Sequence, residues 1–267
     1  MPAKFCTLAS GSSGNCHIVS DGRSQLLIDA GLSGKQIQKR ILDLGMVPEN
    51  LSGILVSHEH QDHVKGAGIL SRRFKLPIYA NEKTWMAMEE KIGPVKPEHR
   101  RVFDNQKPFT IGDISVTPYS LSHDAADPMG FALESHSFKI CLATDMGYVP
   151  ESLYQVAQNA DLLVMESNHD VDMLQVGSYP YYLKRRVLSD HGHLSNESAG
   201  YAIVEMIRRN VKSILLAHLS QENNFPELAY STVTGIMEEN GMKPINDVRL
   251  NLSTREAISC LYAYKSG

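Results

Sequence analysis

Six short apolar segments, each followed by a histidine or an acidic residue, constrain the fold of this chain more than any other feature. The segments cover residues 25–28, 53–57, 114–121, 139–144, 161–165 and 213–217. The polar residues after them are, in the same order, Asp29, His58, His123, Asp145, Glu166 and His218. Apolar runs of this length are typical of buried β-strands. Because chemistry in open α/β folds collects beyond the carboxyl ends of strands, the six ends predict one site assembled from many strands.

Helical patterns lie between these predicted strands. Residues 33–44 carry apolar side chains on one helical face, residues 195–207 begin at a capping residue, Ser195, and residues 229–239 are a third candidate helix. Strands that alternate with helices predict an α/β layered architecture. We find no linker, internal repeat or low-complexity segment, so we expect a single domain spanning residues 1–267.

Composition excludes several classes of protein. The 26 Lys and Arg residues against 30 Asp and Glu give a net charge of −4, which excludes a uniformly basic coat for nucleic acid but leaves room for local basic patches. No apolar run approaches the roughly 18 residues of a membrane helix, and residues 1–15 lack the apolar core of a signal peptide. The four cysteines form no CxxC pair, which favours reduced, buried thiols in a cytoplasmic protein. They are Cys6, Cys16, Cys141 and Cys260.

A dense cluster of metal-ligand side chains follows the second predicted strand. Its sequence is His58-Glu59-His60-Gln61-Asp62-His63. Histidine nitrogen suits Zn, Mn, Fe or Ni, and carboxylate oxygen suits the harder divalent ions. One ion cannot comfortably take three imidazoles and the Asp62 carboxylate from so short a loop, so we expect two ions, with further ligands from the other strand ends. The alternative, a solvated histidine-rich loop, fits poorly with the buried strand directly before it.

The ordered set of these residues resembles the metallo-β-lactamase superfamily. The motif His58-x-His60-x-Asp62-His63 has Asp29 before it and His123, Asp145 and His218 after it, in that family's order. The resemblance implies an α/β fold with a four-layer αβ/βα sandwich, and a hydrolase that holds two divalent metal ions, Zn or Mn. It assigns His58, His60 and His123 to one ion, Asp62, His63 and His218 to the other, and Asp145 as a bridge between them.

The same resemblance gives Asp29 a supporting role. It would accept a hydrogen bond from a ligand imidazole and fix the tautomer of that ring. The other interpretation of Asp29 is a turn residue before Gly31.

Two later segments resemble the RNase Z-like phosphodiesterase branch of the superfamily. They are Met165-Glu166-Ser167-Asn168-His169 and His191-Gly192-His193-Leu194-Ser195. A phosphodiester needs its departing alkoxide protonated, and an imidazole polarised by a carboxylate suits that task. We therefore expect His193 to be the general acid and Glu166 to orient it, so that His193, Glu166, Asp62 and Asp29 form the catalytic set. The alternatives are a charge at a strand end for Glu166 and a polar residue before a helix cap for His193.

Two further segments are candidates for substrate contact. In the opening loop, residues 8–16, Ser12, Ser13 and Asn15 suit phosphate oxygens, although a plain turn between strands would have the same composition. In residues 178–186, tyrosines can stack on bases and cations can pair with phosphates. The candidates there are Tyr181, Tyr182, Arg185 and Arg186, and the alternative is a surface loop or helix start with a solvated basic face. Both segments resemble the YycJ/WalJ group, a bacterial, DNA-processing branch of the superfamily with 5′-to-3′ exonuclease activity.

The sequence therefore predicts a binuclear metal-dependent nuclease, a 5′-to-3′ exonuclease on single-stranded DNA ends, with no membrane segment. It does not predict an oligomeric state. Only 72 residues separate Asp145 from His218, too few for the cap domain of large nuclease members, so we expect loops to contact the substrate. The main alternative is a metal-dependent hydrolase of a small cyclic phosphodiester or lactone. A di-iron oxidoreductase is disfavoured because His60 stands where those members typically carry Glu, and a non-enzymatic module is disfavoured because no ligand is missing.

Overall fold

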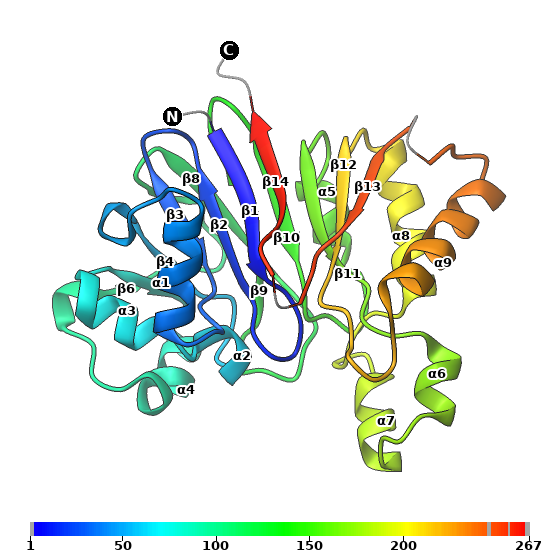
Figure 1. Cartoon of the computed structure of the whole chain (residues 1–267), viewed down its shortest axis with the longest axis horizontal. Helices are drawn as coiled ribbons and strands as arrows, with labels where there is room; N and C mark the ends of the chain where they lie inside the picture. The colour runs from blue at the N-terminus through cyan, green and yellow to red at the C-terminus, as the bar shows by residue number, and fades with distance from the viewer. Residues whose placement is uncertain (1–2, 245–246, 256, 265–267) are drawn as a thin grey trace.

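Two seven-stranded β-sheets form the centre of the protein (Figure 1). The computed structural model describes residues 3–244, 247–255 and 257–264. The first sheet has the order β14 (Ser259–Tyr264), β1 (Ala3–Ala9), β2 (Cys16–Ser20), β3 (Gln25–Ile28), β4 (Gly53–Leu55), β5 (Ile78–Ala80) and β6 (Arg100–Val102). The second has the order β13 (Arg249–Leu252), β12 (Ser213–Ala217), β11 (Leu162–Glu166), β10 (Lys139–Ala143), β9 (Met129–Glu134), β8 (Ile114–Ser120) and β7 (Phe109–Ile111).

Both sheets are mixed. In the first sheet β3, β4, β5 and β6 are parallel, and in the second β10, β11, β12 and β13 are parallel; the remaining neighbours are antiparallel. Parallel neighbours end at the same edge of a sheet, so the loops after them lie side by side. This arrangement brings together the strand ends on which the sequence places its polar residues.

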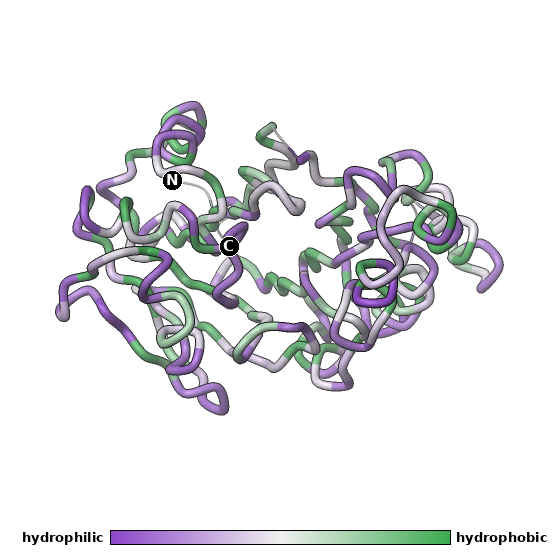
Figure 2. The backbone as a smooth tube through the Cα atoms, turned by 90° about the horizontal axis from the view of Figure 1, so that it is seen from below, coloured by the Kyte–Doolittle hydropathy of each residue, from purple (hydrophilic) through white to green (hydrophobic). Residues whose placement is uncertain are grey.

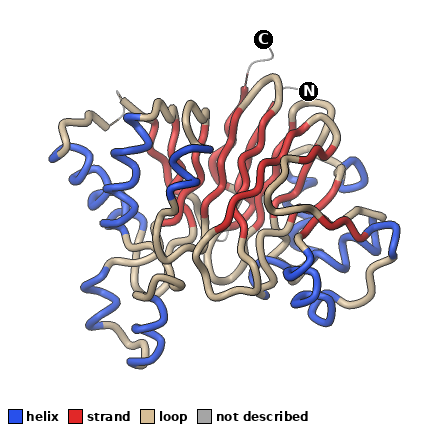
Figure 3. Tube along the Cα trace, turned by 180° about the vertical axis from the view of Figure 1, so that it is seen from behind, coloured by secondary structure: helices blue, strands red, loops and turns tan. Residues whose placement is uncertain are grey.

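Helices cover the outer face of each sheet (Figure 3). Beside the first sheet lie α1 (Gly34–Asp43), α2 (Gln61–Val64), α3 (Ala67–Phe74), α4 (Glu82–Ile92) and the 3-10 turns η1 (Pro48–Asn50) and η2 (Pro97–His99). Beside the second lie α5 (Glu151–Val156), α8 (Asn196–Arg208) and α9 (Pro226–Glu239), while α6 (Val171–Val176) and α7 (Tyr181–Val187) project below the sheets (Figure 1). The predicted four-layer αβ/βα sandwich is confirmed. No helix within the described residues combines the length and the apolar character needed to span a bilayer.

Alternation along the strands separates three layers of core. Leu27 packs under the helices of the first sheet, whereas its neighbours Leu26 and Ile28 point into the layer between the sheets. Likewise Leu215 of β12 faces the inter-sheet layer and Ile214 faces the helices of the second sheet. Successive side chains of a strand point to opposite faces, so continuous apolar strands are expected where both faces are buried. Figure 2 shows these hydrophobic stretches along central strands and mixed colours on the outer helices.

The predicted elements agree with the structure except at some of their ends. Residues 33–44 form α1, where Ser33 and Gln36 make a reciprocal capping box, and the segment predicted from residue 195 forms α8 with Ser195 as its cap. The helix predicted from residue 229 begins earlier, because Pro226 suits the first helical position. Four predicted strand ends were wrong by one or two residues. β4 ends at Leu55, β8 at Ser120 and β10 at Ala143, and Glu166 is the last residue of β11 and does not follow it.

Candidate metal centre

Three of the strand-end residues have a left-handed backbone. Asp29 after β3, Asp145 after β10 and His218 after β12 have φ angles of 57°, 64° and 56°. This region is sparsely populated by residues other than glycine and costs of the order of 1 kcal/mol or more for each. The strain turns the chain sharply as it leaves the sheet. All three side chains are buried, and the three residues stand where the two sheets face one another.

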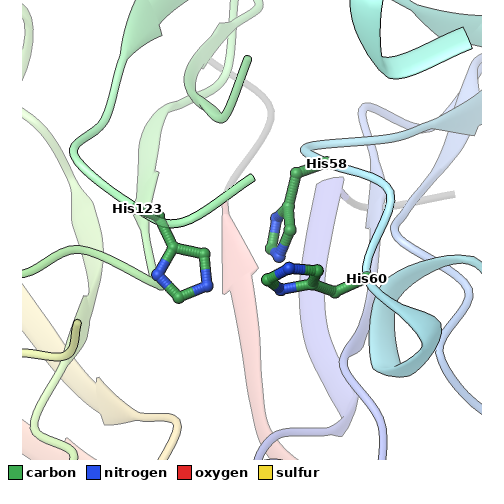
Figure 4. Close-up of side chains that lie close together, drawn as sticks. All are labelled: His58, His60 and His123. Atoms are coloured by element: carbon green, nitrogen blue, oxygen red, sulfur yellow. The ribbon is translucent and has the colours of Figure 1, made fainter. Parts of the chain in front are cut away.

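His58, His60 and His123 form the first group of ligand-type side chains (Figure 4). His58 and His60 come from the loop after β4, and His123 comes from the loop after β8 on the other sheet. Their ring centroids lie 4.7 to 5.2 Å apart. His58 Nδ1 lies 3.0 Å from Ser57 Oγ, and His123 Nδ1 lies 3.0 Å from the carbonyl oxygen of Gly192. These contacts engage the Nδ1 atoms and leave Nε2 of both rings for a ligand.

Asp62, His63 and His218 form the second group, with their ligand atoms within 4.8 Å of one another. Asp62 Oδ2 lies 3.6 Å from His63 Nε2 and 3.9 Å from His218 Nε2. These two groups coincide with the two ligand sets that the family resemblance implies. Two further groups of ligand atoms overlap them: His58, His63 and Asp145, and Asp145, Glu166, His193 and His218.

Asp145 lies between the two groups. Its Oδ2 atom is 3.2 Å from His63 Nε2, and its Oδ1 atom is 3.8 Å from His123 Nε2 and 3.3 Å from His218 Nδ1. A carboxylate that reaches residues of both groups has the position of a bridging ligand.

The unpaired atoms of this cluster fit a divalent cation. Among the described residues, His58 Nε2, His218 Nε2 and Asp145 Oδ2 are buried and have no hydrogen-bond partner. The last two face other ligand atoms of the cluster, at 3.9 Å from Asp62 Oδ2 and 3.2 Å from His63 Nε2. Buried polar atoms without partners are rare and costly, and their natural partner here is a metal ion. Imidazole nitrogens with carboxylate oxygens are a donor set for Zn or Mn. The site therefore has the chemistry of a metal centre.

Mutual electrostatics support the same conclusion. Burial alone would raise the pKa of Asp145, but the adjacent His218 and His63 hold it well below its usual range. Burial alone would lower the pKa of His63, but the carboxylates of Asp145, Asp29 and Asp62 raise it well above its usual range. The buried carboxylates are stabilised by a nearby positive charge, and the proton that they favour on His63 supplies part of it.

Asp29 supports the cluster from behind. Its Oδ2 atom lies 2.8 Å from His63 Nδ1, and its two oxygens also accept hydrogen bonds from the backbone N–H and the hydroxyl of Ser57. Nδ1 of His63 is thereby held as the donor, which leaves Nε2 facing Asp62 and Asp145. The contact predicted for Asp29 is present in the structure, whereas its effect on a metal stays a prediction.

Glu166 holds two histidines at once. It is fully buried, and its Oε1 atom lies 2.7 Å from His193 Nδ1 and 2.9 Å from His218 Nδ1, while Oε2 accepts a hydrogen bond from the N–H of Met146. Burial alone would raise the pKa of Glu166, but His193 and His218 lower it to about 2. The anionic carboxylate therefore fixes His193 with Nε2 as the free atom. The pairing with His218 was not predicted from the sequence.

The opening loop packs directly onto the ligand loop. Asn15 is buried; its Nδ2 atom lies 3.0 Å from His63 Nε2 and 3.3 Å from Asp62 Oδ2, and its N–H donates to the carbonyl of Asp62. At Gly31 an added Cβ would lie 1.6 Å from that same carbonyl oxygen, so only glycine fits this close approach. Ser12 and Ser13 are exposed and remain candidates for substrate contact, whereas Asn15 contacts the predicted ligands.

The tyrosine and arginine segment, for which a loop or a helix start was left open, forms helix α7. Tyr181 and Tyr182 are 75% and 74% exposed, which leaves both rings free to stack. The Arg185 guanidinium lies 5.9 Å from the centre of the Tyr181 ring. A phosphate contact was expected to be a free cation, but Arg186 forms an ion pair with Asp124. The hydrogen bond to Asp124 raises the pKa of Arg186.

Several residues of the site carried no sequence signal. Ser57 contacts Asp29, His58 and His63 through its hydroxyl, and Asp124 lies 3.4 Å from His123 Nε2. Each stands directly beside a predicted ligand in the chain, and that adjacency was the only available hint.

Comparisons with known proteins agree with this geometry. A model of the beta-lactamase superfamily domain matches residues 24–218. The exodeoxyribonuclease YycJ of Bacillus anthracis is 46% identical over 241 residues, which cover 90% of this chain and 91% of that protein. The exodeoxyribonuclease WalJ of Streptococcus pneumoniae D39 is 43% identical over 232 residues, 86% of each chain. The metallo-beta-lactamase fold protein YhfI from Bacillus subtilis superposes with a TM-score of 0.72 at 19% identity, covering 97% of this chain and 100% of YhfI, and thus shares the fold.

Proposed function

The chain belongs to the metallo-β-lactamase superfamily, and we propose that it is a binuclear metal-dependent phosphodiesterase, a 5′-to-3′ exonuclease that acts on single-stranded DNA ends. One observation carries the proposal: seven ligand-type side chains from loops of both sheets converge in two groups around Asp145. The relatives named exodeoxyribonucleases, at 43% to 46% identity over most of the chain, support DNA as the substrate.

We assign two ions, Zn or Mn, to this cluster. His58, His60 and His123 would hold one, Asp62, His63 and His218 would hold the other, and Asp145 would bridge them. Two such ions supply a water of lowered pKa and neutralise charge that develops on phosphate oxygens. Asp29 and Ser57 keep His63 in the required tautomer, and Glu166 does the same for His218.

His193 is the candidate general acid. Its Nδ1 atom is engaged by Glu166, its side chain is 19% exposed, and its ring lies 5.0 Å from that of His123. A proton on Nε2 can therefore reach a leaving oxygen beside the first ligand group, while the Glu166 carboxylate stabilises the imidazolium.

Helix α7 is the candidate surface for the DNA strand. Tyr181 and Tyr182 offer exposed rings for bases, and Arg185 offers a cation for the backbone. The salt bridge between Arg186 and Asp124 connects this helix to the loop that carries His123. The exposed Ser12 and Ser13 would contact phosphate.

We place the reaction in the cytoplasm. The three cysteines with described side chains are Cys6, Cys16 and Cys141, and all are buried; Cys16 and Cys141 are free thiols, as suits a reducing compartment. The side chain of Cys260 lies outside the described set. DNA ends are also found there in bacteria, the source of both close relatives.

A metal-dependent nuclease assay tests the proposal. Purified protein is incubated with single- and double-stranded DNA and RNA, each labelled at either end, with added Mn or Zn and with a chelator control. We expect release of label from the 5′ end of single-stranded DNA and its abolition by the chelator. A panel of cyclic nucleotides and lactones is run in parallel. Turnover of these compounds without DNA cleavage would favour the small-molecule hydrolase.

A further inference from the structure

A cavity of about 370 Å³ lies beside the candidate metal centre, at the start of α9. Its walls come from Ser10, from the loop after β12, from Phe225 and Pro226 at the start of α9, and from Ser253 to Arg255 after β13. Its volume falls within the range of small-ligand pockets, about 300–1,000 Å³. Neither the ligand groups nor helix α7 accounts for it.

The cavity offers polar atoms without partners. Ser253 is 6% exposed, and its hydroxyl makes no hydrogen bond within the described part of the chain. Arg255 donates from Nη2 to the carbonyl of Leu219 at 3.1 Å, but its Nε atom is buried without a partner. A buried hydroxyl and a guanidinium with free donors are suited to a ligand with several acceptor oxygens.

The described lining of the cavity carries a positive charge. Among the lining residues that the structure describes, Arg255 is the one charged side chain, and none is acidic. Helix α9 has 14 residues and no side-chain cap. Pro226 has no N–H, and the N–H of Ala229 donates to the carbonyl of Phe225, so the N–H groups of Glu227 and Leu228 are the ones left open to an added acceptor. The positive end of a helix of this length adds to the attraction for an anion, although the exposed Glu227 in that turn weakens it.

The cavity is joined to the metal centre through its wall. The hydroxyl of Ser10 accepts a hydrogen bond from the N–H of the predicted ligand His218 at 2.9 Å, and Leu219 is the next residue. Arg255 packs on Gly11, where an added Cβ would lie 3.3 Å from its Cγ atom. A group held by Arg255 would therefore lie next to a DNA strand whose scissile phosphate is at the candidate metal centre.

We propose that this cavity binds the 5′-terminal nucleotide of the DNA strand. The terminal phosphate lies against Arg255, the Ser253 hydroxyl and the first turn of α9, and the base stacks on Phe225, whose ring is 46% exposed. This inference rests on the proposed exonuclease function and adds to it a preference for a phosphorylated 5′ end.

The test compares two single-stranded oligonucleotides of one sequence, with a 5′-phosphate or a 5′-hydroxyl. The wild-type protein should degrade the phosphorylated strand about tenfold faster or more, as expected for a charge-assisted contact. Arg255→Gln should bring the ratio of the two rates close to one, and the milder Ser253→Ala should lower it several-fold. Arg249→Gln, an exposed position at the start of β13, is the matched control and should keep the wild-type ratio.

The possible failures are distinguishable. Equal wild-type rates on the two strands overturn the terminal-nucleotide site but leave the exonuclease proposal intact, and so does a preference that both Arg255→Gln and Ser253→Ala retain. Absence of DNA cleavage by the wild-type protein overturns the exonuclease proposal and this inference with it. Ser253→Ala removes only one oxygen, so it gives a result even where Arg255→Gln fails to fold.

Discussion

Asp145 is the carboxylate whose oxygens face Nε2 atoms of both ligand groups, so its replacement should have the largest effect on turnover. Asp145→Asn retains the size and the tolerance of left-handed backbone that this position, with φ of 64°, requires. We expect turnover to fall on the order of 10³-fold, because the charge that joins the two groups is lost. Steady-state assays with saturating metal, with circular dichroism to check folding, measure this; near-wild-type turnover would contradict a bridging role.

His193 should behave differently from Asp145. It lies within ligand distance of Asp145 and Glu166, so it could serve either as a metal ligand or as the acid. If His193 is the general acid, His193→Ala lowers turnover on the order of 10²–10⁴-fold, while the metal content stays at the wild-type level. Metal analysis of the purified variant distinguishes the two roles. If His193→Ala and Asp145→Asn lose metal equally, His193 is a ligand and not the acid.

At the scale of residues, the sequence predicted positions well and contacts poorly. His58, Asp145 and His218 could be identified because each directly follows an apolar strand. The hydroxyl of Ser57 and the second histidine on Glu166 could not, because these contacts depend on how the chain turns after the strand. At His218 a left-handed backbone sets the turn, and in a single sequence nothing distinguishes it from an ordinary loop.

At the scale of elements, α7 allows a test of strand binding apart from catalysis. Tyr181→Ala and Tyr182→Ala should each weaken binding of single-stranded DNA by about 1–3 kcal/mol, the usual value of one stacked base. Tyr201→Ala, an exposed tyrosine on α8, is the matched control and should bind as the wild type does. Fluorescence anisotropy with a labelled oligonucleotide, in calcium or chelator to prevent cleavage, measures the affinities. Equal affinities for all three variants would exclude α7 from the DNA surface.

Strand β2 carries a histidine that should make the fold sensitive to acid. His17 is buried, stacks on Phe5 at 5.7 Å and lies 3.1 Å from the Thr7 hydroxyl; its burial, together with His63 and His218, lowers its pKa to about 3. The unfolded chain therefore binds the proton first as the pH falls below about 6.5, so stability is lost with falling pH down to about 3. Between pH 7.5 and pH 5, protonation of His17 in the unfolded chain should lower the free energy of unfolding by about 2 kcal/mol.

Urea unfolding at the two pH values, in chelator, measures this effect. The free energy of unfolding of the wild type should fall more steeply than that of His17→Gln, which has no ring to protonate. Parallel slopes in the two proteins would show that His17 does not control acid stability.

Some of the elements that the sequence analysis did not predict are short or interrupted, although the 11-residue α4 and the 7-residue β1 were also not predicted. β5 and β6 have three residues each, too few to show a pattern, and β2 contains the buried His17 where an apolar residue is expected. The central parallel strands β3, β11 and β12 were predicted because both their faces are buried, which makes them continuously apolar. For the segment that forms α7 the sequence left a loop or a helix start open, because only Val187 of this helix is buried and the segment lacks an apolar face.

At the scale of the whole molecule, the candidate metal centre joins the two sheets. His58, His60, Asp62 and His63 follow β4 of the first sheet, while His123, Asp145 and His218 follow strands of the second. Ions held by both sets would act as a cross-link over the inter-sheet core, and the folded state alone presents the complete set. Metal binding should therefore stabilise the fold, by about 4 kcal/mol when free metal exceeds its dissociation constant a thousandfold.

Chelation should accordingly lower the melting temperature of the wild-type protein, and excess Mn or Zn should restore it in a concentration-dependent way. In Asp145→Asn the same addition should raise the melting temperature less, because one ligand shared by both groups has lost its charge. Scanning calorimetry with and without chelator, on both proteins, gives the four values needed. A wild-type melting temperature that is indifferent to chelator and to added metal would show that the seven side chains do not bind an ion across the sheets, and the proposed metal-dependent hydrolysis would lose its basis.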